Sequence, residues 1–186
     1  MDDFAARQSS YQGLLVNVLM VSGFFLIQIS QANSAMFGLS KKYDVHLCPE
    51  VKGQILQEGT PVAGLEVLRG LTYVDNIERL DSTVTDAQGR FLLPEVVIQS
   101  KLPGDMFVES RTRQIIIAKR FDIDYLLWGG ILHGIEPNEA FSIKLSTLQC
   151  DLISPEINFE FYNKLNPKLP FTAQGICRWE QDFTPY

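Results

Sequence analysis

Short runs of alternating apolar and polar residues recur along most of the chain. The clearest cover 43–48, 51–56, 62–68 and 78–85. A period of two is typical of strands with one buried face, because successive side chains point to opposite faces of a sheet. The segment 113–121 contains three consecutive isoleucines, which indicates a central strand buried on both faces. The pattern predicts a mainly β fold.

Two turns between these runs have recognisable chemistry. At 57–61, Gly59 can adopt a positive φ and Pro61 lacks the N–H of an interior ladder position, so 51–56 and 62–68 are predicted to form a hairpin. At 85–90, Asp86 can accept hydrogen bonds from the following backbone and Gly89 can close the turn. Such turns between short strands predict an antiparallel β-sandwich.

Later segments extend this assignment. The run 123–128 predicts a strand, and Asp75–Asn76 a turn between 71–75 and 78–85. The segment 140–150 alternates again and predicts another strand. The part from 151 to 186 is less regular, and we expect a C-terminal extension packed on the sandwich.

The segment 51–94 resembles the carboxypeptidase regulatory-like, or transthyretin-like, β-sandwich family. The residues that carry the resemblance are Gly53, Ile55, Gly59, Pro61, Val62, Ala63, Gly64 and Val67, followed by Thr85, Asp86, Gly89 and Phe91. The resemblance implies a seven-stranded Greek-key sandwich that serves as a binding or structural module. It implies no catalytic residues.

The N-terminal segment 1–35 contains an apolar run at 14–29. We expect a cleaved export signal, with the better cleavage point after Ala32, and therefore a periplasmic β-sandwich domain at 36–150. An uncleaved signal anchor in the inner membrane is one alternative. In the other, Met36 is the true start and the protein stays in the cytoplasm. Contact with a membrane is expected only through this segment, if it is uncleaved.

Composition and charge narrow the possible partners. The chain has 186 residues, is 46% hydrophobic and carries a net charge of −6, which argues against a protein that binds nucleic acid through its phosphates. It has three cysteines. In an exported protein we expect Cys150 to pair with Cys177, which would contribute about 3–4 kcal/mol by loop closure. Cys48, paired with either of the others, is the alternative.

The sequence contains no recognisable pattern of catalytic or metal-binding residues. His46 and Cys48 share a strand face but lack a third orienting group. His46 and His133 are the only histidines, and no metal-ligand spacing surrounds them. Asp122 and Asp124 share a strand face, with too few other oxygen ligands for calcium. We expect no enzyme activity, no cofactor and no metal.

The remaining hypothesis is a protein that works by protein–protein recognition. The chain also resembles small proteins found beside type VI secretion toxins, which implies an immunity protein that neutralises a secreted antibacterial effector in the periplasm. A toxin inhibitor needs a rigid patch of aromatic and charged residues. The candidate partner-binding residues are Asp122, Asp124, Tyr125 and Trp128 on one strand, with Pro103, Met106 and Phe107 in one loop.

Two other functions are consistent with the same sequence. One is a structural subunit of the cell envelope. The other is an accessory module that binds carbohydrate or peptide, in which Trp128 or Trp179 would be an exposed stacking platform.

Overall fold

The computed structural model describes residues 41–186, and the expected signal segment 1–35 lies outside these residues. The strands are β1 (Tyr43–Cys48), β2 (Val51–Gln57), β3 (Thr60–Pro61), β4 (Glu66–Tyr73), β5 (Glu78–Val84), β6 (Arg90–Leu93), β7 (Val96–Ser100), β8 (Arg111–Arg120), β9 (Ile123–His133), β10 (Leu148–Asp151), β11 (Ile157–Phe161), β12 (Phe171–Gly175), β13 (Cys177–Arg178) and β14 (Thr184–Pro185). This part also has a 3-10 turn, η1 (Leu102–Gly104), and an α-helix, α2 (Glu139–Leu145). The prediction of a mainly β fold is confirmed.

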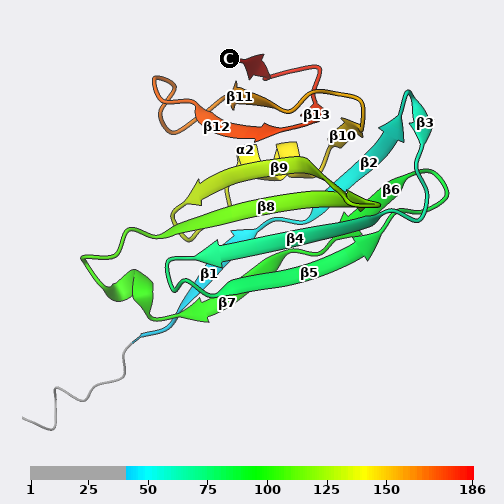
Figure 1. The fold of residues 1–186 in the computed structure, drawn as a ribbon. Helices are drawn as coiled ribbons and strands as arrows, with labels where there is room; N and C mark the ends of the chain where they lie inside the picture. Colours follow the sequence, from blue (N-terminus) through cyan, green and yellow to red (C-terminus); the bar gives the residue numbers. More distant parts are fainter. Residues whose placement is uncertain (1–40) are drawn as a thin grey trace, which may run out of the picture. The chain divides into compact units, whose positions relative to one another are not determined.

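The largest sheet has seven antiparallel strands in the order β14-β11-β12-β9-β8-β4-β5. Its β4, β5, β8 and β9 strands form the near layer in Figure 1, with β1, β2, β6 and β7 behind them. The isoleucine-rich strand β8 pairs with β4 on one side and β9 on the other, so its predicted central position is confirmed. The predicted burial on both faces is wrong, because Ile116 is buried while Ile115 and Ile117 on the other face are only half-buried. The turn at Asp75–Asn76 also lies between β4 and β5, as predicted.

The second sheet is organised around β2, and here one predicted hairpin is wrong. Strand β2 pairs antiparallel with β3 and β6 and parallel with β10. The turn after Gln57 forms with Gly59 at φ +75°, and β3 ends at Pro61. Val62 still donates its N–H to the Ile55 carbonyl at 3.0 Å, but the Ile55 N–H donates to Gly89, so the pairing goes no further. The chain then crosses to the large sheet, where 66–73 becomes β4. A third sheet consists of β1 and β7.

The turn at 85–90 has the predicted chemistry but joins different sheets. The Asp86 carboxylate accepts hydrogen bonds from the backbone N–H groups of Gln88 at 2.9 Å and Arg90 at 2.8 Å. Gly89 has φ +70°, and a Cβ there would lie 2.4 Å from the carbonyl oxygen of Ile55. Glycine is therefore required where the chain passes from β5 to β6.

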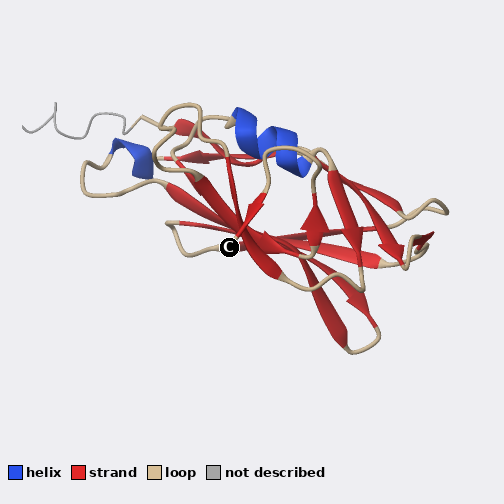
Figure 2. Ribbon diagram, turned by 90° about the horizontal axis from the view of Figure 1, so that it is seen from above, coloured by secondary structure: helices blue, strands red, loops and turns tan. Residues whose placement is uncertain are grey.

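The predicted strand at 140–150 is wrong in its first half, which is the helix α2. Asn138 caps this helix, because its side chain accepts hydrogen bonds from the N–H groups of Ala140 and Phe141. Phe141 and Leu145 are buried while Ile143 is exposed, so the buried positions follow helical spacing. Figure 2 shows α2 on one side of the strands. No helix in residues 41–186 is long and apolar enough to cross a membrane.

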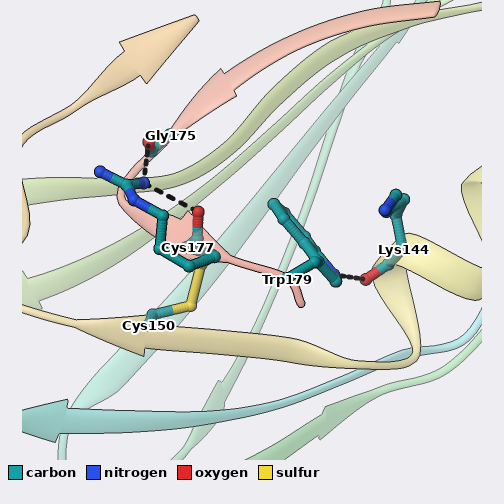
Figure 3. The surroundings of a disulfide bond; sticks show 6 residues. Lys144, Cys150, Gly175, Cys177 and Trp179 are labelled. Carbon is teal, nitrogen blue, oxygen red and sulfur yellow. Dashed lines mark hydrogen bonds between the residues drawn. A yellow bond between two sulfur atoms is a disulfide. The ribbon is translucent and has the colours of Figure 1, made fainter. Parts of the chain in front are cut away.

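The disulfide between Cys150 and Cys177 is present, which confirms the predicted pair (Figure 3). It joins β10 to β13, whose residues face one another in the ladder. Trp179 lies near the disulfide in this view, and its Nε1 donates to the carbonyl oxygen of Lys144 at 3.2 Å. The segment 151–186 thus contributes four strands to the two larger sheets.

Residues Lys41–Tyr186 form one compact unit with a continuous apolar core. At one end of this core, Trp128 lies between Phe141, Phe159, Phe161 and Trp179, with ring centroids 5.7–6.2 Å from its own. A unit with its own core and its own disulfide is expected to fold without the preceding segment.

Candidate functional site: the β8–β9 turn

The two longest strands of the large sheet are joined by a two-residue turn, Phe121–Asp122, closed by the pair Arg120 and Ile123. The Phe121 side chain is 92% exposed, and Ile123 is 54% exposed. A large aromatic side chain that stays this exposed in the described part of the chain gains little from folding. The turn therefore projects an apolar tip into solvent.

The backbone of Phe121 is also strained. Its φ is +54°, in the left-handed region that favours glycine. Two-residue hairpin turns commonly have glycine, asparagine or aspartate at such positions, and a residue with a Cβ costs about 1–2 kcal/mol there. Phenylalanine at this position destabilises the folded chain without packing against it. Strain of this kind is found most often at functional sites.

The turn is held by contacts from its base. The Arg120 guanidinium lies 5.8 Å from the centre of the Phe121 ring and donates a hydrogen bond to Gln57 Oε1 at the end of β2. The neighbouring turn after Gln57 is fixed in its own right, because the Asp151 carboxylate accepts from the N–H groups of Glu58 at 3.0 Å and Gly59 at 2.9 Å. The hydrogen bond from Arg120 to Gln57 therefore connects the turn, which belongs to the large sheet, to the end of β2 in the second sheet.

Charged residues border the apolar tip. Asp122 is in the turn itself, and Asp124 pairs across the ladder with Lys119, which pairs in turn with Glu66 on β4. All four side chains are exposed. The tip thus has an apolar centre and a mixed rim with an excess of carboxylates, which is the arrangement of many protein-binding surfaces.

The structure brings together only some of the predicted partner-binding residues. Asp122 and Asp124 lie at the tip, and Tyr125 is half-buried one position further along β9. Trp128 is fully buried, and its Nε1 donates to Gln114 Oε1 at 3.1 Å. Trp128 therefore cannot contact a partner at the surface, and we correct this assignment. Leu127 is an extra residue of β9 opposite Ile116 and Ile117, and this bulge moves Trp128 to the buried face of the sheet.

The predicted loop residues lie at the other end of β8. Met106 and Phe107 are 88% and 91% exposed, and Pro103 is half-buried in η1. The Asp105 carboxylate accepts from the Phe107 N–H at 3.0 Å and so shapes this loop. Ten strand residues separate it from the tip, or about 33 Å, so the two groups of candidates form two separate surfaces.

The free thiol of the chain, Cys48, lies inside the molecule and is inaccessible. Cys48 is fully buried, and burial raises the pKa of its thiol to about 11, against the smaller opposing effect of Arg69. A protonated thiol without access is a poor nucleophile. Among residues 41–186, no three His, Cys, Asp or Glu side chains are grouped as metal ligands.

Phe121 is the site residue that sequence reasoning missed. Phe121 is the last residue of the apolar run 113–121, and the pattern therefore predicts that its side chain is buried in the core. The signal that could have identified it is the single residue between Phe121 and Ile123, which forces a tight turn between two strand-forming runs.

Comparison with known proteins gives one match. Residues 51–155, more than half of the chain, match the family described as Domain of unknown function (DUF6795). No curated protein and no solved structure matches the chain. The matched segment includes β2 to β10, and thus the complete β8–β9 turn. The chain belongs to the DUF6795 family.

Proposed function

We propose that this protein is a non-enzymatic protein-binding module that inserts the β8–β9 turn into a cleft of its partner. The observation that carries the proposal is Phe121, which is exposed, strained and held on a firm base. Exposed aromatic side chains that fill a partner's pocket supply much of the binding energy in protein interfaces. The carboxylates of Asp122 and Asp124 suit a cleft with a basic rim.

The more specific proposal is an immunity protein that neutralises a secreted antibacterial effector in the periplasm. A protruding turn that blocks an active-site cleft would inhibit an enzyme without any chemistry of its own. A buried disulfide is typical of exported proteins, and the apolar run at 14–29 is consistent with export.

Binding and neutralisation can be tested on residues 33–186, which contain the complete compact unit. This form, immobilised, is expected to retain one partner from the source organism, and the Phe121→Ser variant to lose it. The partner, expressed alone in the periplasm of a test bacterium, is expected to stop growth. Co-expression of the wild-type chain should restore growth, whereas the Phe121→Ser variant should not.

Phe107→Ser is the matched control, because Phe107 is equally exposed at the opposite end of β8. It is expected to bind and protect like the wild type. Equal protection by wild type and Phe121→Ser would refute the tip as the binding site. A partner that is harmless in the periplasm would refute the immunity role.

A finer description of the fold is also proposed: a variant of the transthyretin-like Greek-key sandwich. The turn at 85–90 connects β5 of the large sheet to β6 of the second sheet, and the segment after β3 crosses from the second sheet to β4 of the large one, as connections between the layers of a sandwich do. The chain departs from that plan in the parallel pairing of β10 with β2 and in the helix α2.

A second candidate function is favoured by one groove. About 850 Å³ of space lies above Gly129 and Gly130, bordered by Asn158, Gln174 and Tyr186. Planar amides beside an exposed aromatic ring suit a carbohydrate, which is the accessory-module function. Titration with soluble glycans, followed by tyrosine and tryptophan fluorescence, tests it. A response lost in Tyr186→Ala would support this function, and no response to any glycan would reject it.

A further inference from the structure

Strand β5 is an edge strand of a kind that proteins usually protect. Within residues 41–186 it ends the seven-stranded sheet and pairs only with β4, through seven consecutive residue pairs without a bulge. Three other outer strands, β3, β13 and β14, have two residues each, and β3 and β14 contain proline. β5 has seven residues and contains no proline, glycine or lysine. A long regular edge offers unpaired backbone groups to another strand.

The side chains of β5 also favour pairing with another strand. Leu80 and Val84 are 69% and 58% exposed on the outer face, with Ser82 between them. Charges that could repel a second strand are occupied within the chain. The Asp81 carboxylate accepts from Arg69, and Arg79 donates to the carboxylate of Asp75. Glu78, at the start of the strand on the outer face, lies 3.8 Å from Arg113. The edge is thus open in its backbone, apolar at Leu80 and Val84, and its charged side chains have partners within the chain.

We infer that this edge binds the same edge of a second copy, so that two seven-stranded sheets join into one. A two-fold axis through Ser82 places Leu80 of each copy opposite Val84 of the other, on the same face. It also places Asp81 opposite Thr83. Glu78 of each copy would come opposite Asp86 of the other, but Asp86 lies beyond the end of β5 and its carboxylate accepts from the N–H groups of Gln88 and Arg90. An axis through Asp81 would instead oppose two carboxylates, which destabilises a strand pair. The strand is therefore self-complementary in the Ser82 register, as a two-fold interface requires.

The inference is independent of the proposed partner, because β5 and the Phe121 turn are different surfaces. The first experiment measures mass by light scattering, over a range of concentrations, on residues 33–186. A dimer is expected. Val84→Lys places a lysine at the apolar contact of both copies and should weaken dimerisation about tenfold or more. Ile131→Lys is the control, since Ile131 is exposed on the same sheet but in a strand paired on both sides.

The second experiment tests the register by disulfide formation. Opposite Cα atoms in antiparallel strands are about 4.5–5.5 Å apart, within the range that a disulfide spans. Ser82→Cys should therefore give a covalent dimer under mild oxidation. The background is low because Cys150 and Cys177 are paired and Cys48 is buried. In Val84→Cys the two introduced thiols are four residues out of register, about 13 Å along the strand, and should not link.

Clear results would overturn the inference. It fails if the chain is a monomer at every concentration, or if Val84→Lys dimerises as well as Ile131→Lys. It also fails if Val84→Cys links as readily as Ser82→Cys. Phe121→Ser should leave the dimer unchanged, and a loss of dimer in that variant would place the interface at the turn.

Discussion

Arg69 on β4 and Asp81 on β5 are directly opposite in the sheet, and the guanidinium of Arg69 binds the carboxylate of Asp81. Arg69 Nε donates to Asp81 Oδ1 at 2.9 Å, and Nη2 donates to Oδ2. The Arg69 side chain is fully buried, whereas Asp81 is 36% exposed. Removal of the carboxylate would leave a buried cation without a counter-charge, which is far costlier than loss of a surface pair.

Asp81→Ala is therefore expected to lower the free energy of unfolding by about 3 kcal/mol. Chemical denaturation followed by tryptophan fluorescence measures this, because Trp128 lies in the core. Asp122→Ala, at an exposed turn, should change it by about 0.5 kcal/mol or less. Equal effects of the two substitutions would show that Arg69 finds another partner or water.

Phe121→Gly is expected to stabilise the fold. Glycine adopts φ +54° without a steric penalty, and the exposed ring contributes little packing, so the expected gain is about 1 kcal/mol. Phe107→Gly is the matched control. Phe107 is as exposed but is not among the positive-φ residues, so glycine there should lower stability by increasing the entropy of the unfolded chain. Thermal unfolding of the wild type, Phe121→Gly and Phe107→Gly shows whether each substitution raises or lowers stability. A lower stability of Phe121→Gly would contradict the strain argument.

Loss of the disulfide is expected to cost about 3.5 kcal/mol by loop closure, since 27 positions separate Cys150 from Cys177. The double variant Cys150→Ala with Cys177→Ala should therefore denature at lower urea concentration than the wild type. A reducing agent should shift the wild type in the same direction and leave the double variant unaffected. A response of the double variant to reduction would point to a different pairing.

Cys48 predicts a dependence of stability on alkaline pH. Burial raises the pKa of its thiol from the usual value near 9.0 to about 11. A group whose folded pKa is raised contributes stability that is fully present below pH 9.0 and is lost as pH rises through about 11. Compared with Cys48→Ala, the wild type should lose about 2 kcal/mol more over this interval. The two proteins should have parallel pH profiles if the thiol is accessible in the folded state.

The same burial predicts the reactivity of the thiol. At neutral pH the folded chain should not react with a thiol reagent, and one thiol per chain should react after unfolding in denaturant. Rapid reaction of the folded chain would mean that the core opens around Cys48.

Alternation along the sequence was sufficient to predict most strands but not their partners. Gly59 and Pro61 mark a turn correctly, yet nothing local shows that the next strand belongs to another sheet. The helix α2 was missed because Phe141, Ile143 and Leu145 alternate by chance. The Asn138 cap was a better indicator than the alternation.

The candidate site was only partly predictable for a similar reason. Asp122 and Asp124 were found from their type and spacing, whereas Trp128 was assigned to the surface from the same apparent strand face. Its burial depends on the bulge at Leu127 of β9 and on aromatic residues from 141 to 179, which only the folded chain brings together. Phe121 is identified by its φ and exposure, and neither can be read from residue type.

The parallel pairing of β2 with β10 has a consequence for how the molecule is made. Gly53 lies beside Leu148 in this pairing, and Leu56 lies beside Asp151. A chain that leaves a ribosome or a translocation channel from its N-terminal end cannot complete this sheet until most of it has emerged. During synthesis β2 can pair with β3 and β6 on one side, but its other edge stays open until β10 has emerged, so the sheet is expected to be completed late.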